Sequence, residues 1–90
     1  MKKAYDWTRE VKIYFEHTLE YNGCSYLVIF GEHINGGFIA VPNWGWSCEA
    51  ASYYGETFYN ADKLMGAGAS EEIAMKIAEY INSYLKENNN

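Results

Sequence analysis

The fold is decided by residues 11–42, which read VKIYFEHTLE YNGCSYLVIF GEHINGGFIA VP. Apolar and polar residues alternate from Val11 to Leu19, and a period of two is typical of a half-buried β-strand. Asn22-Gly23 follows, and Asn-Gly is a strong hairpin signal because both central residues of a type I′ turn need a positive φ. The stretch therefore predicts a hairpin with strands at about 10–20 and 24–34.

A two-residue turn also predicts which residues of the two strands face each other. The expected pairs are Tyr21 with Cys24, Leu19 with Tyr26, His17 with Val28, Phe15 with Phe30, and Ile13 with Glu32. Apolar positions match across both strands, which favours this register. Glu32 then falls on the core-facing side, where we expect its carboxylate to reach water at the end of the sheet or to pair with His17 or Arg9.

A second turn at Asn35-Gly36-Gly37 predicts a third strand at about 37–42, which ends at Pro42 because proline cannot donate to a sheet ladder. The pattern also allows a fourth strand at 46–51. The other face of the sheet, bearing Tyr14, Leu27 and Ile29, is expected to be partly apolar. Such a face needs a cover, either the aromatic loop that follows Pro42 or a second copy of the protein.

Two helices are expected after the strands. Asn60 is the predicted N-cap of a short helix at about 60–65, and Ser70 is the predicted N-cap of a helix at about 70–86. The second helix carries one apolar stripe, made of Ile73, Ile77, Ala78, Ile81, Tyr84 and Leu85. We therefore expect one α+β domain over residues 1–90, an antiparallel three- to four-stranded meander with the C-terminal amphipathic helix packed on one face.

The distribution of charge limits the possible partners. The net charge is −5, and no lysine or arginine lies between Lys12 and Lys63. The acids in that stretch are Glu16, Glu20, Glu32, Glu49, Glu56 and Asp62. Such a surface cannot neutralise phosphates, so direct binding to nucleic acid or to an anionic membrane is disfavoured, whereas a basic partner is permitted.

The N-terminus and the cysteines indicate a cytoplasmic protein. No apolar stretch follows Met1-Lys2-Lys3, which disfavours a signal peptide, and no segment has transmembrane length. The two cysteines, Cys24 and Cys48, do not resemble the disulfide framework of a small secreted protein. We expect both to be free, buried thiols.

No motif predicts catalysis, a cofactor or a metal. The alternation places His17 and His33 on opposite faces of the sheet, and structural zinc is disfavoured because Cys-x-x-Cys and His-x-x-x-His pairs are absent. An enzyme would have to use Cys48 with His33 as its base, but no nearby lysine or arginine activates that thiol. The approach Gly66-x-Gly68-x-Ser70 resembles an anion site, yet Glu71 and Glu72 follow it and would repel phosphate.

The best binding candidates are aromatic residues and acids in the segment that follows the third strand. They are Trp44, Trp46, Glu49, Tyr53, Tyr54, Glu56, Phe58 and Tyr59. Tryptophan and tyrosine supply much of the binding energy at interfaces, and rings rimmed by carboxylates can hold a lysine or an arginine. The alternative, of equal weight, is that these rings form a second small core between the loop and the helices.

A resemblance covers most of the chain. It is carried by the stretch from Val28 to Phe38, by Val41-Pro42-Asn43-Trp44-Gly45, by Cys48-Glu49, and by Thr57-Phe58-Tyr59-Asn60 with Lys63-Leu64. These residues resemble a family of small proteins of unknown function from clostridial and other gut Firmicutes genomes and their phages or prophages. The resemblance implies a small accessory protein that binds and inhibits a host defence protein, and it supplies no catalytic residues.

The leading hypothesis is a non-catalytic binding protein that inhibits a host macromolecule, with a basic groove as its target. An alternative is an oligomer that binds or sequesters a small, nucleotide-like molecule in a pocket between subunits, built from the aromatic loops and the start of the last helix. A plain structural domain is a further alternative, and an enzyme is the least favoured.

Overall fold

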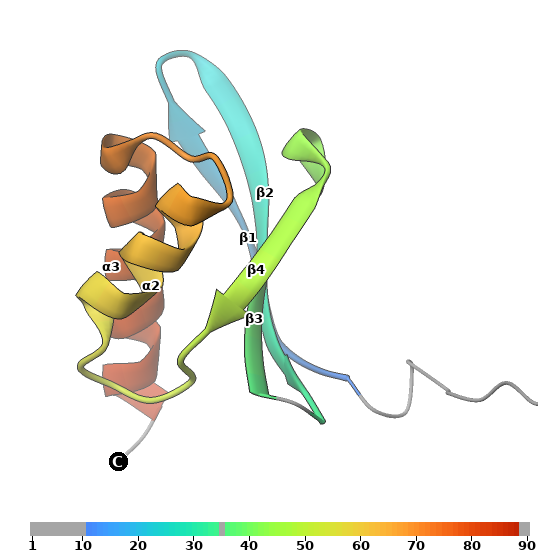
Figure 1. Cartoon of the computed structure of the whole chain (residues 1–90), viewed down its shortest axis with the longest axis vertical. Coiled ribbons are helices and arrows are strands. Elements are labelled where there is room, and N and C mark those ends of the chain that lie inside the picture. Colours follow the sequence, from blue (N-terminus) through green and yellow to red (C-terminus); the bar gives the residue numbers. More distant parts are fainter. Residues whose placement is uncertain (1–10, 35, 89–90) are drawn as a thin grey trace, which may run out of the picture.

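The computed structural model describes residues 11–34 and 36–88. It has two layers, a four-stranded antiparallel sheet in the order β1-β2-β3-β4 and two helices that cover one face of it (Figure 1). The elements are β1 Lys12–Tyr21, β2 Cys24–His33, β3 Gly36–Val41, the 3-10 helix η1 Pro42–Trp44, β4 Trp46–Ala50, α2 Thr57–Gly66 and α3 Glu71–Asn88. The predicted α+β meander is confirmed, and its fourth strand is present. Asn35, in the predicted second turn, lies outside the described residues.

The hairpin of β1 and β2 follows the predicted register over most of its length. Asn22 and Gly23 have φ angles of 53° and 79°, and Phe15 lies opposite Phe30 as expected. A β-bulge then shifts the pairing, so that Lys12 rather than Ile13 faces Glu32. The expected pair of Ile13 with Glu32 was therefore wrong, because a bulge inserts one residue that the alternation of the sequence does not mark.

The inserted residue of the bulge is Tyr14, and the bulge moves it onto the helix-covered face of the sheet. Its ring lies 5.3 Å from that of Phe30 and 6.2 Å from that of Tyr84. Ile13 is 45 % exposed instead. The expectation that Tyr14 belongs to the other face of the sheet was wrong for the same reason.

The core lies between the sheet and the helices. Its large apolar side chains with at most 2 % exposure are Val28, Phe30, Ile39, Val41, Leu64, Ile77 and Ile81. The stripe of α3 faces this core, with Ile73, Ala78 and Leu85 also buried. Ser70 accepts a hydrogen bond from the backbone N–H of Ile73 (3.3 Å), which confirms it as the N-cap of α3.

Two local predictions were wrong. Helix α2 begins at Thr57 with Glu56 at its N-cap, whereas Asn60, the predicted cap, lies inside the helix and is 2 % exposed. Cys24 is exposed, because it directly follows the hairpin turn, and only Cys48 is partly buried. Both thiols are free. In the described part of the chain, neither helix is long and apolar enough to cross a membrane.

Candidate functional site

The loop between β4 and α2 is held at both ends by asparagine side chains. Asn60 Oδ1 accepts the backbone N–H of Ala51 (2.7 Å), and Asn60 Nδ2 donates to the carbonyl of Ala51 (3.3 Å). At the other end, Asn82 of α3 accepts the backbone N–H of Gly55 (2.7 Å). A loop fixed at two points presents its side chains in one arrangement, which lowers the entropy lost on binding.

This loop and the first turn of α2 expose four aromatic side chains, here called the aromatic patch. Its members and their exposed fractions are Tyr53 (60 %), Tyr54 (50 %), Phe58 (78 %) and Tyr59 (43 %). Large apolar rings are costly to leave in water, and contiguous exposed groups of them usually mark an interaction surface. The second small core that the sequence left open is not formed by these four rings.

Carboxylates lie beside the aromatic patch, and one of them already holds a cation. Lys63 Nζ is 3.5 Å from Glu49 Oε1 and 5.5 Å from the centre of the Tyr59 ring. Glu49 itself is 77 % exposed, and Glu56 stands at the N-cap of α2 between the two pairs of rings. The arrangement can bind an ammonium or guanidinium group through a ring face and a carboxylate together.

Trp44 does not join the aromatic patch. Asn43 accepts the backbone N–H of Leu27 (2.7 Å), which fixes η1 against β2, and the Trp44 ring packs 4.7 Å from that of Tyr26. A hollow of about 270 Å³ opens there, lined by Tyr26, Trp44, Gly68, Ala69, Ser70 and Ile73. The side chain of Trp46 lies outside the described residues. The predicted group of aromatic residues therefore divides into two separate places.

A polar cluster at the end of the sheet was missed by the sequence analysis. Glu32 accepts hydrogen bonds from the hydroxyl of Tyr14 and, at 3.4 Å, from that of Ser52. The hydrogen bond to Glu32, followed by burial, raises the pKa of Tyr14 to about 12. The carboxylate is partly exposed at the end of the sheet, as expected, but it is paired with the two hydroxyls rather than with His17. Arg9 lies outside the described residues.

The residues considered for catalysis do not meet. Cys48 is paired with Ile39 on the helix-covered face of the sheet, whereas His33 stacks on Phe38 (5.5 Å, 9° between the ring planes) on the other face. Burial raises the pKa of the Cys48 thiol to about 11, which disfavours the reactive thiolate. Within residues 11–34 and 36–88, no group of three or more potential metal ligands is present.

The structure is that of a small α+β protein with an exposed aromatic patch between β4 and α2. The chain belongs to DUF6618, a family of unknown function whose model matches residues 3–90. This agrees with the resemblance to a family of unknown function. No curated protein and no solved structure matches the chain.

Proposed function

We propose that this protein is a non-catalytic binding protein that blocks a basic surface of another protein. The aromatic patch is the centre of the contact, and Glu49 and Glu56 lie at its rim. The observation that carries the proposal is the exposure of four rings within residues 53–59, in a loop fixed by Asn60 and Asn82. Buried aromatic anchors surrounded by a polar rim are the usual source of interface affinity.

Charge supports a basic partner. No lysine or arginine lies between residues 12 and 63, and Lys63 beside the patch is paired with Glu49, so the patch faces an approaching cationic surface with little repulsion. The position of Lys63, between Glu49 and Tyr59, illustrates how such a cation is accommodated. An arginine of the partner would compete with Lys63 for these two groups and would add planar stacking on the ring.

The kind of partner follows from the same chemistry. A protein groove that binds nucleic acid is basic, and an acidic protein seated in it competes with the phosphates. The phage or prophage setting that the resemblance implies makes a host defence protein the favoured target. Binding would then inhibit the target by occupying its groove, with no reaction on the part of this chain.

The first experiment compares three baits in host lysate: the wild type, Phe58→Ser, and Ile34→Ser as a matched control. Phe58 and Ile34 are both highly exposed (78 % and 67 %), and Ile34 lies beyond β2 outside the aromatic patch, so both variants are expected to fold. The proposal expects a basic protein that is captured by the wild type and by Ile34→Ser and is lost with Phe58→Ser. Equal capture by all three baits would contradict it.

A second experiment uses the purified partner and tests the acidic rim. Glu56→Lys should weaken binding about fivefold at low salt and flatten the salt dependence, because rim charges act mainly through long-range attraction. Glu79→Lys, an exposed acid on α3, is the matched control and should change affinity much less. An unchanged salt dependence for Glu56→Lys would show that the charge of Glu56 does not contribute to binding the partner.

A small ligand is the second candidate function, and the hollow beside Trp44 favours it. That hollow combines the aromatic loop and the start of α3 within one chain, whereas the sequence suggested a pocket between subunits. Its rings suit an uncharged, flat group such as a nucleobase, since Glu71 and Glu72 in the first turn of α3 oppose a phosphate. Adenosine, guanosine and their phosphates in a thermal-shift screen test this, and no stabilisation by any of them would exclude it.

A further inference from the structure

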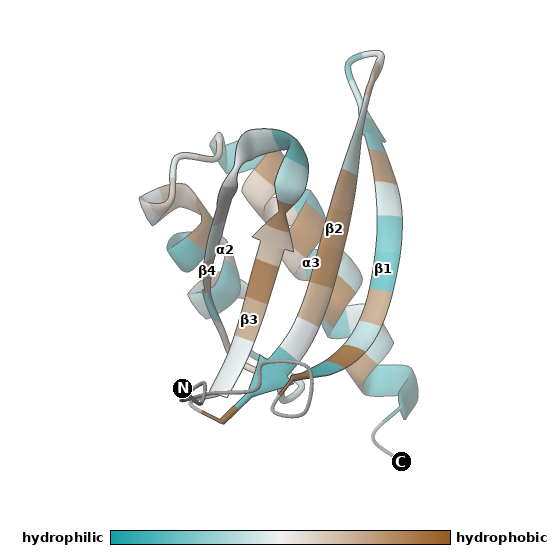
Figure 2. Ribbon diagram, turned by 90° about the vertical axis from the view of Figure 1, so that its right-hand side faces the viewer, coloured by the Kyte–Doolittle hydropathy of each residue, from teal (hydrophilic) through white to brown (hydrophobic). Residues whose placement is uncertain are grey.

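The face of the sheet that the helices leave open is apolar at its centre. Figure 2 looks onto this face, with α2 and α3 behind the sheet. Its apolar side chains are Ile13, Leu27, Ile29, Phe38 and Ala40, which alternate along the strands with the buried residues of the core. The aromatic loop does not cover this face, because Trp44 packs on Tyr26 among the residues that contact the core.

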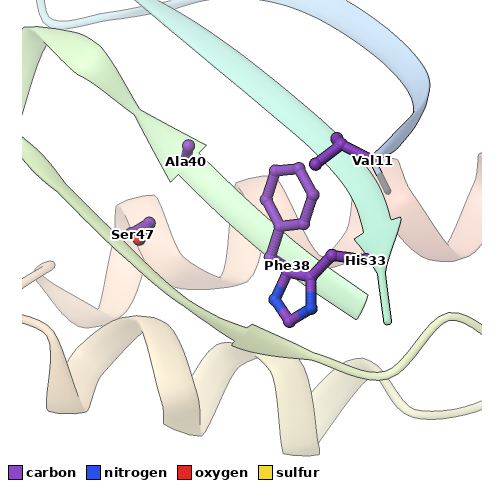
Figure 3. A pocket seen from close by; sticks show the side chains of 5 residues that line it. All are labelled: Val11, His33, Phe38, Ala40 and Ser47. Carbon is purple, nitrogen blue, oxygen red and sulfur yellow. The ribbon is translucent and has the colours of Figure 1, made fainter. Parts of the chain in front are cut away.

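A hollow of about 300 Å³ lies in this open face. It is lined by Val11, His33, Phe38, Ala40 and Ser47 (Figure 3). The Phe38 ring lies over the backbone of Gly31, where an added Cβ would come within 3.0 Å of it. The small side chains of Ala40 and Ser47 leave space beside that ring, and the hollow is wide enough for one aromatic side chain.

The acidic side chains around the hollow favour a segment that carries positive charge. Glu49 lies opposite Phe38 in β4 and is 77 % exposed, and Glu16 is exposed on the same face of β1. Glu49 is already paired with Lys63 of α2 (3.5 Å), and residues 13–62 hold no lysine or arginine, so a cation for Glu16 has to come from outside that stretch. A second copy of the protein would bring the same carboxylates together, which opposes a face-to-face dimer.

Residues 1–10, MKKAYDWTRE, combine the two kinds of side chain that the open face would bind, aromatic rings for the hollow and cations for the carboxylates. They hold Tyr5 and Trp7 together with Lys2, Lys3 and Arg9, against the acids Asp6 and Glu10. The described chain starts at Val11, which lines the hollow, so this segment leaves from its edge. Four residues reach about 13 Å when extended, enough to bring Trp7 over Phe38. The family match, residues 3–90, includes most of the segment.

We propose that residues 1–10 dock on the open face of the sheet, with Trp7 in the hollow against Phe38 and a basic side chain directed to Glu16. The segment then forms a third layer on the side opposite the helices. This contact is within one chain and does not depend on the proposed binding function, because the aromatic patch belongs to the β4–α2 loop and α2.

A double-mutant cycle in the full-length chain tests the docking. Trp7→Ser should lower Tm by about 5 °C, since it removes a buried ring. In an Ala40→Glu background, which puts a carboxylate into the hollow, the same substitution should change Tm by less than about 1 °C. Thr18→Glu, on the open face of β1 outside the lining of the hollow, is the matched control and should leave the effect of Trp7→Ser intact.

Nuclear Overhauser effects supply the direct readout. Trp7 indole protons should show contacts with the Ala40 methyl group and the Phe38 ring, and Ala40→Glu should remove them. The absence of these contacts together with an unchanged Tm for Trp7→Ser would overturn the proposal. Contacts found only between differently labelled molecules would overturn it too, in favour of a second copy as the occupant.

Discussion

Asn60 binds both backbone groups of Ala51, although the two residues belong to different elements and are nine positions apart. Asn60 lies inside α2 and is 2 % exposed, and Ala51 follows the last residue of β4. The amide side chain thus continues the ladder of the sheet where β4 ends. Through this contact the edge of the sheet, the loop with Tyr53 and Tyr54, and α2 become one unit.

Asn60→Ala should lower the free energy of unfolding by about 2–3 kcal/mol, because it leaves a buried N–H and carbonyl without partners. Asn82→Ala is the matched control. It removes one hydrogen bond, to the exposed backbone N–H of Gly55, and should cost about 1 kcal/mol or less because water can replace the acceptor. Urea unfolding measures both values. Equal losses would show that the burial of Asn60 does not matter.

Tyr14→Phe should lower stability in a manner that depends on pH. The pKa of Tyr14 is raised to about 12, above the ordinary value of about 10, so the folded state favours the protonated hydroxyl. The contribution is complete below pH 10 and is lost as pH rises from about 10 toward 12. The difference in unfolding free energy between wild type and Tyr14→Phe should therefore be smaller at about pH 11 than at about pH 8.

The control for this prediction is Glu32→Gln, which removes the carboxylate that raises the pKa of Tyr14. In that background, Tyr14→Phe should have a smaller effect that changes little between the two pH values. If the pH dependence remained in the Glu32→Gln background, a titrating group other than the Tyr14–Glu32 pair would be its cause.

The sequence predicted what local patterns determine and missed what depends on contacts between distant residues. Asn22-Gly23 gave the hairpin and most of its register, because the turn geometry is local. The bulge at Tyr14 was not predictable, since the alternation continues through it without a break. It moved Tyr14 to the core side and so created the contact with Glu32.

The candidate site shows the same division. Asn60 was taken for an N-cap because its side chain favours backbone hydrogen bonds, and it does make them, but to Ala51 rather than to its own helix. Trp44 and Phe58 are both aromatic residues in the segment after the third strand, and the sequence does not show which of them is exposed. In the structure Trp44 packs on Tyr26, whereas Phe58 is 78 % exposed. Only the packing of η1 against β2 and the path of the loop separate the two.

The two cysteines should differ in reactivity. In Cys24→Ser, the remaining Cys48 should react with iodoacetamide at pH 8 about 100-fold more slowly than in the urea-unfolded chain, because burial raises its pKa from 9.0 to about 11. In Cys48→Ala, the exposed Cys24 should react at nearly the unfolded rate. Mass spectrometry measures both rates. Fast modification of native Cys48 would show that the thiol is accessible and would reopen a catalytic role.

Gly31→Ala and Gly66→Ala should change stability in opposite directions. A Cβ at residue 31 would lie 2.5 Å from the carbonyl oxygen of Lys12, a backbone atom next to the bulge that cannot move away cheaply. Gly31→Ala should therefore cost about 2 kcal/mol or more, although alanine is otherwise better tolerated than glycine in a strand. At Gly66, the last residue of α2, no atom other than those of its chain neighbours and of the nearby helix backbone lies within 4 Å of the added methyl group, and alanine should stabilise by about 0.5–1 kcal/mol. Urea unfolding of the two variants decides the matter, and stabilisation by Gly31→Ala would mean that the bulge does not hold β1 so close to β2.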